Sequence, residues 1–141
     1  MNRIEINKRI DYITKKLEKL SLSIKKFESS SDENDKYIAL KAIERDCEEI
    51  VESAVRVNQE ILTNSGEIGE TYRDSFEKLK SLKIFTSKEL LEKLANTTGF
   101  RNRLAHDYID IDDDITIVSA KNILEIYPKY LTKISDYLDN K

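Results

Sequence analysis

The fold is decided by residues 37–62, YIALKAIERDCEEIVESAVRVNQEIL. Apolar side chains recur there in alternating steps of three and four, at Leu40, Ile43, Cys47, Ile50, Ala54, Val57 and Ile61. This period predicts an amphipathic helix. Further apolar residues on either side of the stripe widen it beyond the narrow seam of a two-stranded coiled coil. A wide stripe is typical of a helix that several others contact in a bundle.

Similar stripes lie before and after this segment, over residues 6–27 and 117–138. The serine-rich residues 29–32 and the Asn-Ser-Gly sequence at 64–66 are typical of helix ends. A short helix is expected around residues 72–79, and Thr86 with Glu89 forms a capping box that would open the next helix. We expect the last helix to start after the aspartates at 112–114. The sequence therefore predicts an all-α, up-and-down bundle of four to five helices, with residues 1–141 as one domain.

Composition narrows the class of protein. Only three glycines and one proline occur, and 36% of residues are charged, which favours a compact helical domain. The sequence has no long apolar run and no signal peptide pattern, so we expect a cytoplasmic protein without membrane contact. The single cysteine, Cys47, lies on an apolar stripe, where a small core residue is expected. The formal net charge of −3 argues against a general nucleic-acid binder, so any RNA contact would be local.

Residues 99–108, GFRNRLAHDY, hold the chain's only histidine. Arg101 precedes His106 by five positions, Asn102 follows the arginine, and Tyr108 lies two positions after the histidine. Imidazole exchanges protons near neutral pH, and a guanidinium can donate two N–H groups to phosphate oxygens. The bare Arg-x4-His spacing is a weak signal, because an exposed helix histidine beside a carboxylate such as Asp107 explains it as well.

The extended string Arg-Asn-x-x-x-His-x-Tyr is more specific, and it resembles the signature of the HepT-like toxins of the HEPN superfamily. The resemblance continues over most of the chain, through residues 37–62, 75–79, 90–94 and 122–134. It implies a helical nuclease that acts as the toxin of a type VII toxin–antitoxin system and cleaves RNA, either tRNA or mRNA, without a metal or cofactor. It also implies a partner, an MntA-like minimal nucleotidyltransferase antitoxin.

The resemblance carries roles over to individual residues. Arg101 and His106 would be the catalytic pair, and Asn102 would support the imidazole or the phosphate. Tyr108 would accept adenylate groups from the antitoxin, which would block the site through bulk and negative charge. Read from spacing alone, Tyr108 is more often a packing residue.

The directions of side chains along one helix decide whether Arg101 and His106 can contact the same phosphate. On an ideal helix Arg101 and His106 point about 140° apart, so one straight helix cannot aim both at one phosphate. A wrapping arginine, a helix bend near Gly99, or a homodimer could bring them together, and the resemblance favours the dimer. A local bend or a close backbone approach would also explain why a glycine occupies position 99. A catalytically silent helical subunit that docks a nucleotidyltransferase is the alternative function, which the acidic charge favours. A plain helical interaction module is the third.

Overall fold

The structure, a computed structural model, describes residues 1–106 and 111–141 as a bundle of five α-helices and one 3-10 turn. The helices are α1 (Arg3–Ser29), α2 (Glu33–Asn64), α3 (Tyr72–Glu77), α4 (Lys88–Ala105) and α5 (Asp113–Asp139), and the 3-10 turn η1 covers Lys78–Leu82. The predicted all-α bundle is confirmed. Among the described residues, no helix is both long and apolar enough to cross a membrane.

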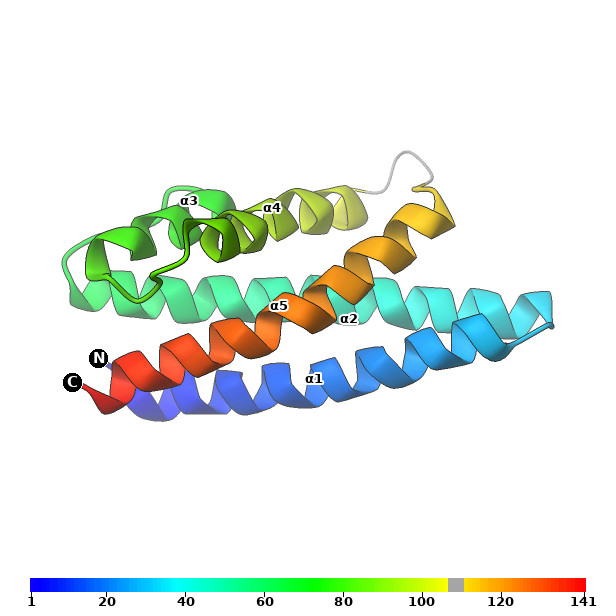
Figure 1. The fold of residues 1–141 in the computed structure, drawn as a ribbon, viewed down its shortest axis with the longest axis horizontal. Coiled ribbons are helices and arrows are strands. Elements are labelled where there is room, and N and C mark those ends of the chain that lie inside the picture. Colours follow the sequence, from blue (N-terminus) through cyan, green and yellow to red (C-terminus); the bar gives the residue numbers. More distant parts are fainter. Residues whose placement is uncertain (107–110) are drawn as a thin grey trace.

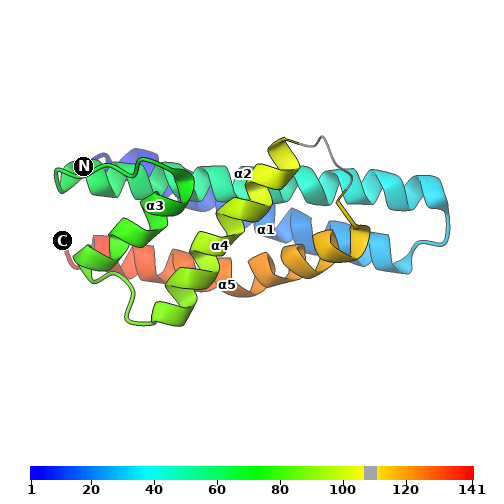
Figure 2. The ribbon, with the colours of Figure 1, turned by 90° about the horizontal axis from the view of Figure 1, so that it is seen from above.

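Helices α1 and α2 form an antiparallel hairpin that α5 crosses on one side (Figure 1). Helices α3 and α4 lie over α2, and α4 runs obliquely so that its C-terminal end is above α2 (Figure 2). The two chain ends meet, because the Arg3 guanidinium donates to the Lys141 carbonyl at 3.0 Å. This arrangement brings the C-terminal end of α4, which carries the motif, against the middle of α2.

The core follows the apolar stripes of the sequence. On α2, Ile43, Cys47 and Ile50 are fully buried, which confirms the interpretation of Cys47 as a core residue. Burial also raises the pKa of the Cys47 thiol far above its usual range. Each apolar side chain of this size stabilises the fold by about 1.5–3 kcal/mol when it is removed from water.

The ends of α1 and α2 lie at the polar and glycine residues, 29–32 and 64–66, from which the sequence predicts helix ends. Ser30 ends α1, Asp32 precedes α2, and Gly66 follows α2 with a φ of 79°. The Glu67 N–H donates to the Leu62 carbonyl at 2.9 Å, which closes the end of α2. Glycine adopts this left-handed conformation without the steric cost that a side chain imposes.

Two predicted helix starts are wrong by one position or more. Ser87, and not Thr86, caps α4, because its hydroxyl accepts the Leu90 N–H at 3.1 Å. Similarly, α5 begins at Asp113, inside the acidic cluster, because the Asp112 carboxylate accepts the Asp114 N–H at 2.8 Å. In both cases the residue whose side chain reaches a free backbone N–H sets the helix start.

Candidate functional site

The arginine of the motif, Arg101, is held firmly at the crossing of α2 and α4. Its Nε and Nη2 both donate to Oε1 of Glu52, at 3.2 and 2.5 Å. Its guanidinium carbon lies 4.7 Å from the centre of the Tyr72 ring. The Arg101 side chain is only 17% exposed, so the ion pair and the ring contact fix the direction of the guanidinium.

Asn102 and His106 occupy the exposed end of α4. The Asn102 side-chain oxygen accepts a hydrogen bond from Nη1 of Arg101 at 3.3 Å, and its backbone carbonyl accepts the His106 N–H at 3.0 Å. His106 is the C-cap of α4, with φ −111° and ψ 48°, so its backbone already departs from the helix. His106 is therefore exposed at the helix end. Asn102 contacts Arg101, and within the described residues no hydrogen bond joins Arg101 to the His106 side chain.

The α2 surface under Arg101 carries two carboxylates. Glu48 lies one helical turn before Glu52, and burial raises the pKa of Glu48, while the positive charges of Arg45 and Arg101 oppose that rise. Because Arg101 offsets some of this acidic charge, its position is favoured electrostatically as well as by hydrogen bonds.

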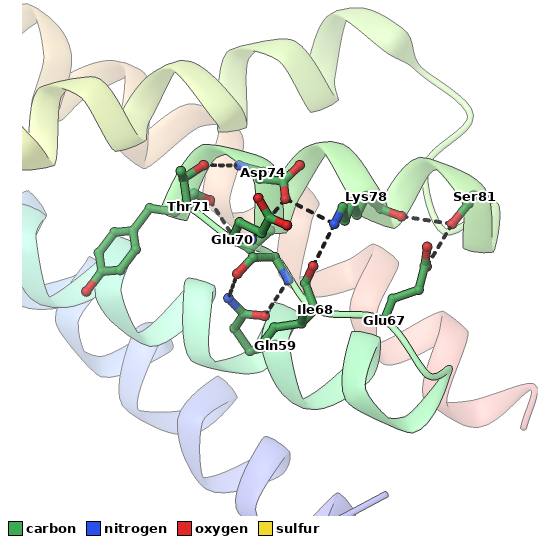
Figure 3. A network of polar contacts seen from close by, with 11 residues as sticks. Gln59, Glu67, Ile68, Glu70, Thr71, Asp74, Lys78 and Ser81 are labelled. Carbon is green, nitrogen blue, oxygen red and sulfur yellow. Dashed lines mark hydrogen bonds and ion pairs between the residues drawn. The ribbon is translucent and has the colours of Figure 1, made fainter.

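A polar network surrounds the start of α3, the helix that Tyr72 opens (Figure 3). The Thr71 hydroxyl caps α3 by accepting the Asp74 N–H at 3.0 Å, and the Asp74 carboxylate accepts the Glu70 N–H at 2.9 Å. The Glu70 hydrogen bond holds the pKa of the Asp74 carboxyl below its usual value. These contacts fix the first turn of α3, and Tyr72 is its first residue.

The loop before α3 is tied to α2 at Gly69. The Gln59 side chain accepts the Gly69 N–H at 2.9 Å and donates to the Gly69 carbonyl at 2.7 Å, as Figure 3 shows. A Cβ on Gly69 would lie 2.6 Å from the Cα of Ser75, so only glycine fits this approach. The loop therefore fixes the start of α3, and with it Tyr72, relative to α2.

Gly99 does not play the role expected from the sequence. It lies inside α4, which continues without interruption to Ala105. A Cβ on Gly99 would meet no atom of the described residues within 4 Å, so the expected close approach within this chain is wrong.

Sequence reasoning missed Glu52 and Tyr72. Glu52 is separated from Arg101 by 49 positions, and no local pattern connects the two. Tyr108, the expected modification site, lies outside the described residues. Within the described ranges, no group of three histidine, cysteine, aspartate or glutamate side chains is placed to hold a metal ion.

The chain is similar to known proteins in both sequence and fold. The model of a family described as ribonuclease HepT-like matches residues 10–134. A tRNA nuclease HepT from Aphanizomenon flos-aquae is 34% identical over 91 residues, which is 63% of this chain and 60% of that protein. The matched segment thus spans less than two thirds of that relative.

Two solved structures share the fold. A tri-AMPylated HEPN toxin of Shewanella oneidensis, solved in complex with an MNT antitoxin, superposes with a TM-score of 0.81 at 22% identity. The superposition covers 96% of this chain and 99% of the toxin. The Bacillus subtilis protein YutE gives a TM-score of 0.77 at 19% identity, covering 99% of this chain and 92% of YutE.

Proposed function

Because the chain belongs to the HepT-like ribonuclease family, we propose that it is a ribonuclease toxin whose site is Arg101 and His106. The observation that carries the proposal is the fixed guanidinium of Arg101, held by Glu52 and Tyr72, with His106 exposed five residues later at the end of the same helix. A preoriented cation and a free imidazole are the groups that cleavage of a phosphodiester needs.

The proposed reaction uses only side chains of the protein. His106 removes the proton of a ribose 2′-hydroxyl, whose oxygen forms a bond to phosphorus while the bond from phosphorus to the 5′-oxygen breaks. An imidazolium returns a proton to the departing 5′-oxygen, which leaves a 2′,3′-cyclic phosphate and a 5′-hydroxyl. Arg101 stabilises the charge that develops on the phosphate, and no step requires a metal.

Arg101 keeps the donors that this role needs. Three of its five N–H groups are used, two by Glu52 and one by Asn102, so two remain for phosphate oxygens. Asn102 supports the site by accepting a hydrogen bond from Nη1 of the arginine.

The experiment that tests the function is direct cleavage of tRNA by the purified protein in EDTA. We expect products that end in a 2′,3′-cyclic phosphate, with a His106→Ala preparation as the control for contaminating nucleases. Equal cleavage by both preparations would remove the assigned site. An intact RNA pool together with tight binding of a nucleotidyltransferase would favour the alternative, a catalytically silent docking subunit, which the net charge of −3 supports.

We also propose a homodimer in which two copies bring their Arg101–His106 sites together. One copy offers a single guanidinium beside acidic residues of α2, and a twofold axis would double the positive charge in the cleft. Light scattering at tens of micromolar is expected to give twice the mass of 16.4 kDa. A monomer that still cleaves RNA would contradict the shared cleft.

The proposed partner is a nucleotidyltransferase antitoxin that adenylylates Tyr108. The Shewanella oneidensis toxin, which shares the fold, was solved AMPylated and bound to its antitoxin. We expect incubation with the cognate nucleotidyltransferase, ATP and Mg²⁺ to add adenylate to Tyr108 and stop cleavage, because the anionic adduct competes with RNA phosphate for Arg101. Tyr108→Phe is expected to cleave RNA and to escape this silencing. Mass spectrometry that finds the adenylate on another residue would contradict this assignment.

A further inference from the structure

A second polar surface adjoins the proposed catalytic site, in a groove between α1 and α2. The groove encloses about 330 Å³ and is lined by Arg9 and Tyr12 of α1 and by Arg45, Glu49, Glu52 and Arg56 of α2. Glu52 connects the two places, because the same carboxylate that lines the groove binds Arg101. The groove therefore adjoins the guanidinium of the motif through Glu52.

The groove is more cationic than the chain as a whole. Its two carboxylates are occupied: Glu49 pairs with Lys16 at 2.9 Å and Arg45 at 2.6 Å, and Glu52 pairs with Arg101. Arg56 is exposed, and no carboxylate of the described residues lies within ion-pair distance of it. In a protein of net charge −3, an uncompensated arginine beside neutralised carboxylates is a local site for an anion.

The arginines are spaced along one face of α2. Arg45 and Arg56 are eleven residues apart, which on an α-helix is about 16 Å along the axis with nearly the same direction. Arg9 lines the same groove from α1, with its guanidinium 3.2 Å from Glu5. Cations in a row suit an extended polyanion better than a single small anion.

An aromatic ring lies among these cations. Tyr12 is 40% exposed, its hydroxyl donates to Glu49, and Nζ of Lys16 lies 5.5 Å from the ring centre. The ring is thus held in place while part of it stays open to the groove. Fixed aromatic rings beside basic side chains are the usual platform for the bases of single-stranded nucleic acids.

We propose that this groove binds single-stranded RNA next to the scissile phosphate, with Arg56, Arg45 and Arg9 on the backbone and Tyr12 stacked on a base. The proposal rests on the proposed ribonuclease function, since it assigns the path of that enzyme's substrate. It explains how an acidic protein holds RNA, because three arginines line one groove that shares Glu52 with the Arg101 site.

The test measures binding without cleavage. The probe is a fluorescein-labelled oligouridylate with 2′-O-methyl riboses, which offers no 2′-hydroxyl to attack, and its anisotropy is followed at several salt concentrations with the full-length protein. We expect Tyr12→Leu to weaken binding about tenfold and Tyr12→Phe to retain it, since stacking needs only the ring. Arg56→Ala is expected to reduce the slope of log K against log salt by about 0.7, the loss of one phosphate contact.

Matched controls lie elsewhere on the surface. Tyr37 is an exposed tyrosine with Nζ of Lys41 5.3 Å from its ring centre, and Arg73 pairs with Glu77 one turn away as Arg9 does with Glu5. Tyr37→Leu and Arg73→Ala are expected to leave binding unchanged. Circular dichroism of every variant checks the fold, and Arg45→Ala, at a side chain 71% exposed, serves if Tyr12→Leu unfolds.

The outcomes separate this proposal from the function on which it rests. RNA cleavage that depends on His106, with binding unaffected by Arg56→Ala and Tyr12→Leu, would overturn the groove and leave the function standing. RNA binding that depends on the groove, without any cleavage, would overturn the ribonuclease function and leave the groove as an RNA-binding surface. A change of oligomeric state in the Arg56→Ala and Tyr12→Leu variants, with RNA binding intact, would assign the groove to a protein interface and overturn the proposal.

Discussion

Expression of this chain without its proposed antitoxin is expected to arrest growth, and replacing His106 with alanine is expected to abolish that arrest. His106 is the only histidine of the chain. General acid–base catalysis contributes about 10²–10⁴-fold to the rate of such reactions. Arg101→Ala is expected to lower cleavage by about 10²–10³-fold, because it removes the preoriented cation at the phosphate. The measurement is the initial rate of tRNA cleavage by each purified variant, beside the growth of cells at equal expression.

Three further variants sharpen this result. Arg101→Lys is expected to lose most of the activity too, because an ammonium group cannot reproduce the Nε and Nη2 bonds to Glu52. Lys93→Ala, on the same helix but paired with Glu89, is the control and should remain toxic. Glu52→Ala is expected to lower the cleavage rate by freeing the guanidinium, and unchanged activity there would show that Glu52 does not position Arg101.

The fold is expected to survive the loss of Arg101. The Glu52 carboxylate is 32% exposed, so water can hydrate it when the arginine is removed. Surface ion pairs contribute about 0–1 kcal/mol to the free energy of unfolding, and the contact of Arg101 with the Tyr72 ring adds about 0.5–2 kcal/mol. Urea denaturation of Arg101→Ala should therefore show a loss within the sum of these two contributions, and a much larger loss would turn the activity result into an effect on folding.

Gly69→Ala is expected to lower the stability of the fold by overpacking. The new Cβ would lie 2.6–2.8 Å from the Cα, Cβ and backbone N of Ser75, so the loop and α3 must move apart. That movement would strain both hydrogen bonds between Gln59 and Gly69 and the packing of fully buried Ser75. Overpacking of this kind costs about 1–3 kcal/mol, measured as the free energy of unfolding in urea.

Gly99→Ala is the matched control, with the opposite sign expected. No atom of the described residues lies within 4 Å of a Cβ there, and the residue is exposed inside α4. Alanine in a helix interior is about 1 kcal/mol more favourable than glycine, so Gly99→Ala should be more stable than the parent protein. Equal destabilisation by the two alanines would refute the steric argument at Gly69.

Because Gly69 precedes α3, Gly69→Ala should also weaken cleavage by displacing Tyr72 from Arg101.

The sequence by itself determined the class of fold and the residues of the motif. Helical periods and end signals such as residues 29–32 and Gly66 act within a few positions, so they can be read along the chain. The predicted starts of α4 and α5 are wrong because neighbouring polar residues compete to cap the same free N–H groups. The roles of Arg101, Asn102, His106 and Tyr108 come from a family resemblance, and they stay predictions until they are measured.

Only the tertiary structure decided what surrounds the motif. Glu52 reaches Arg101 across 49 positions, and Tyr72 reaches it from a third helix, because α4 crosses α2 at one place. The groove of Arg9, Tyr12 and Arg56 likewise exists only where α1 packs against α2. Such contacts depend on the packing of the whole core, which sets the position of each helix relative to the others, and no local pattern of residues records that position.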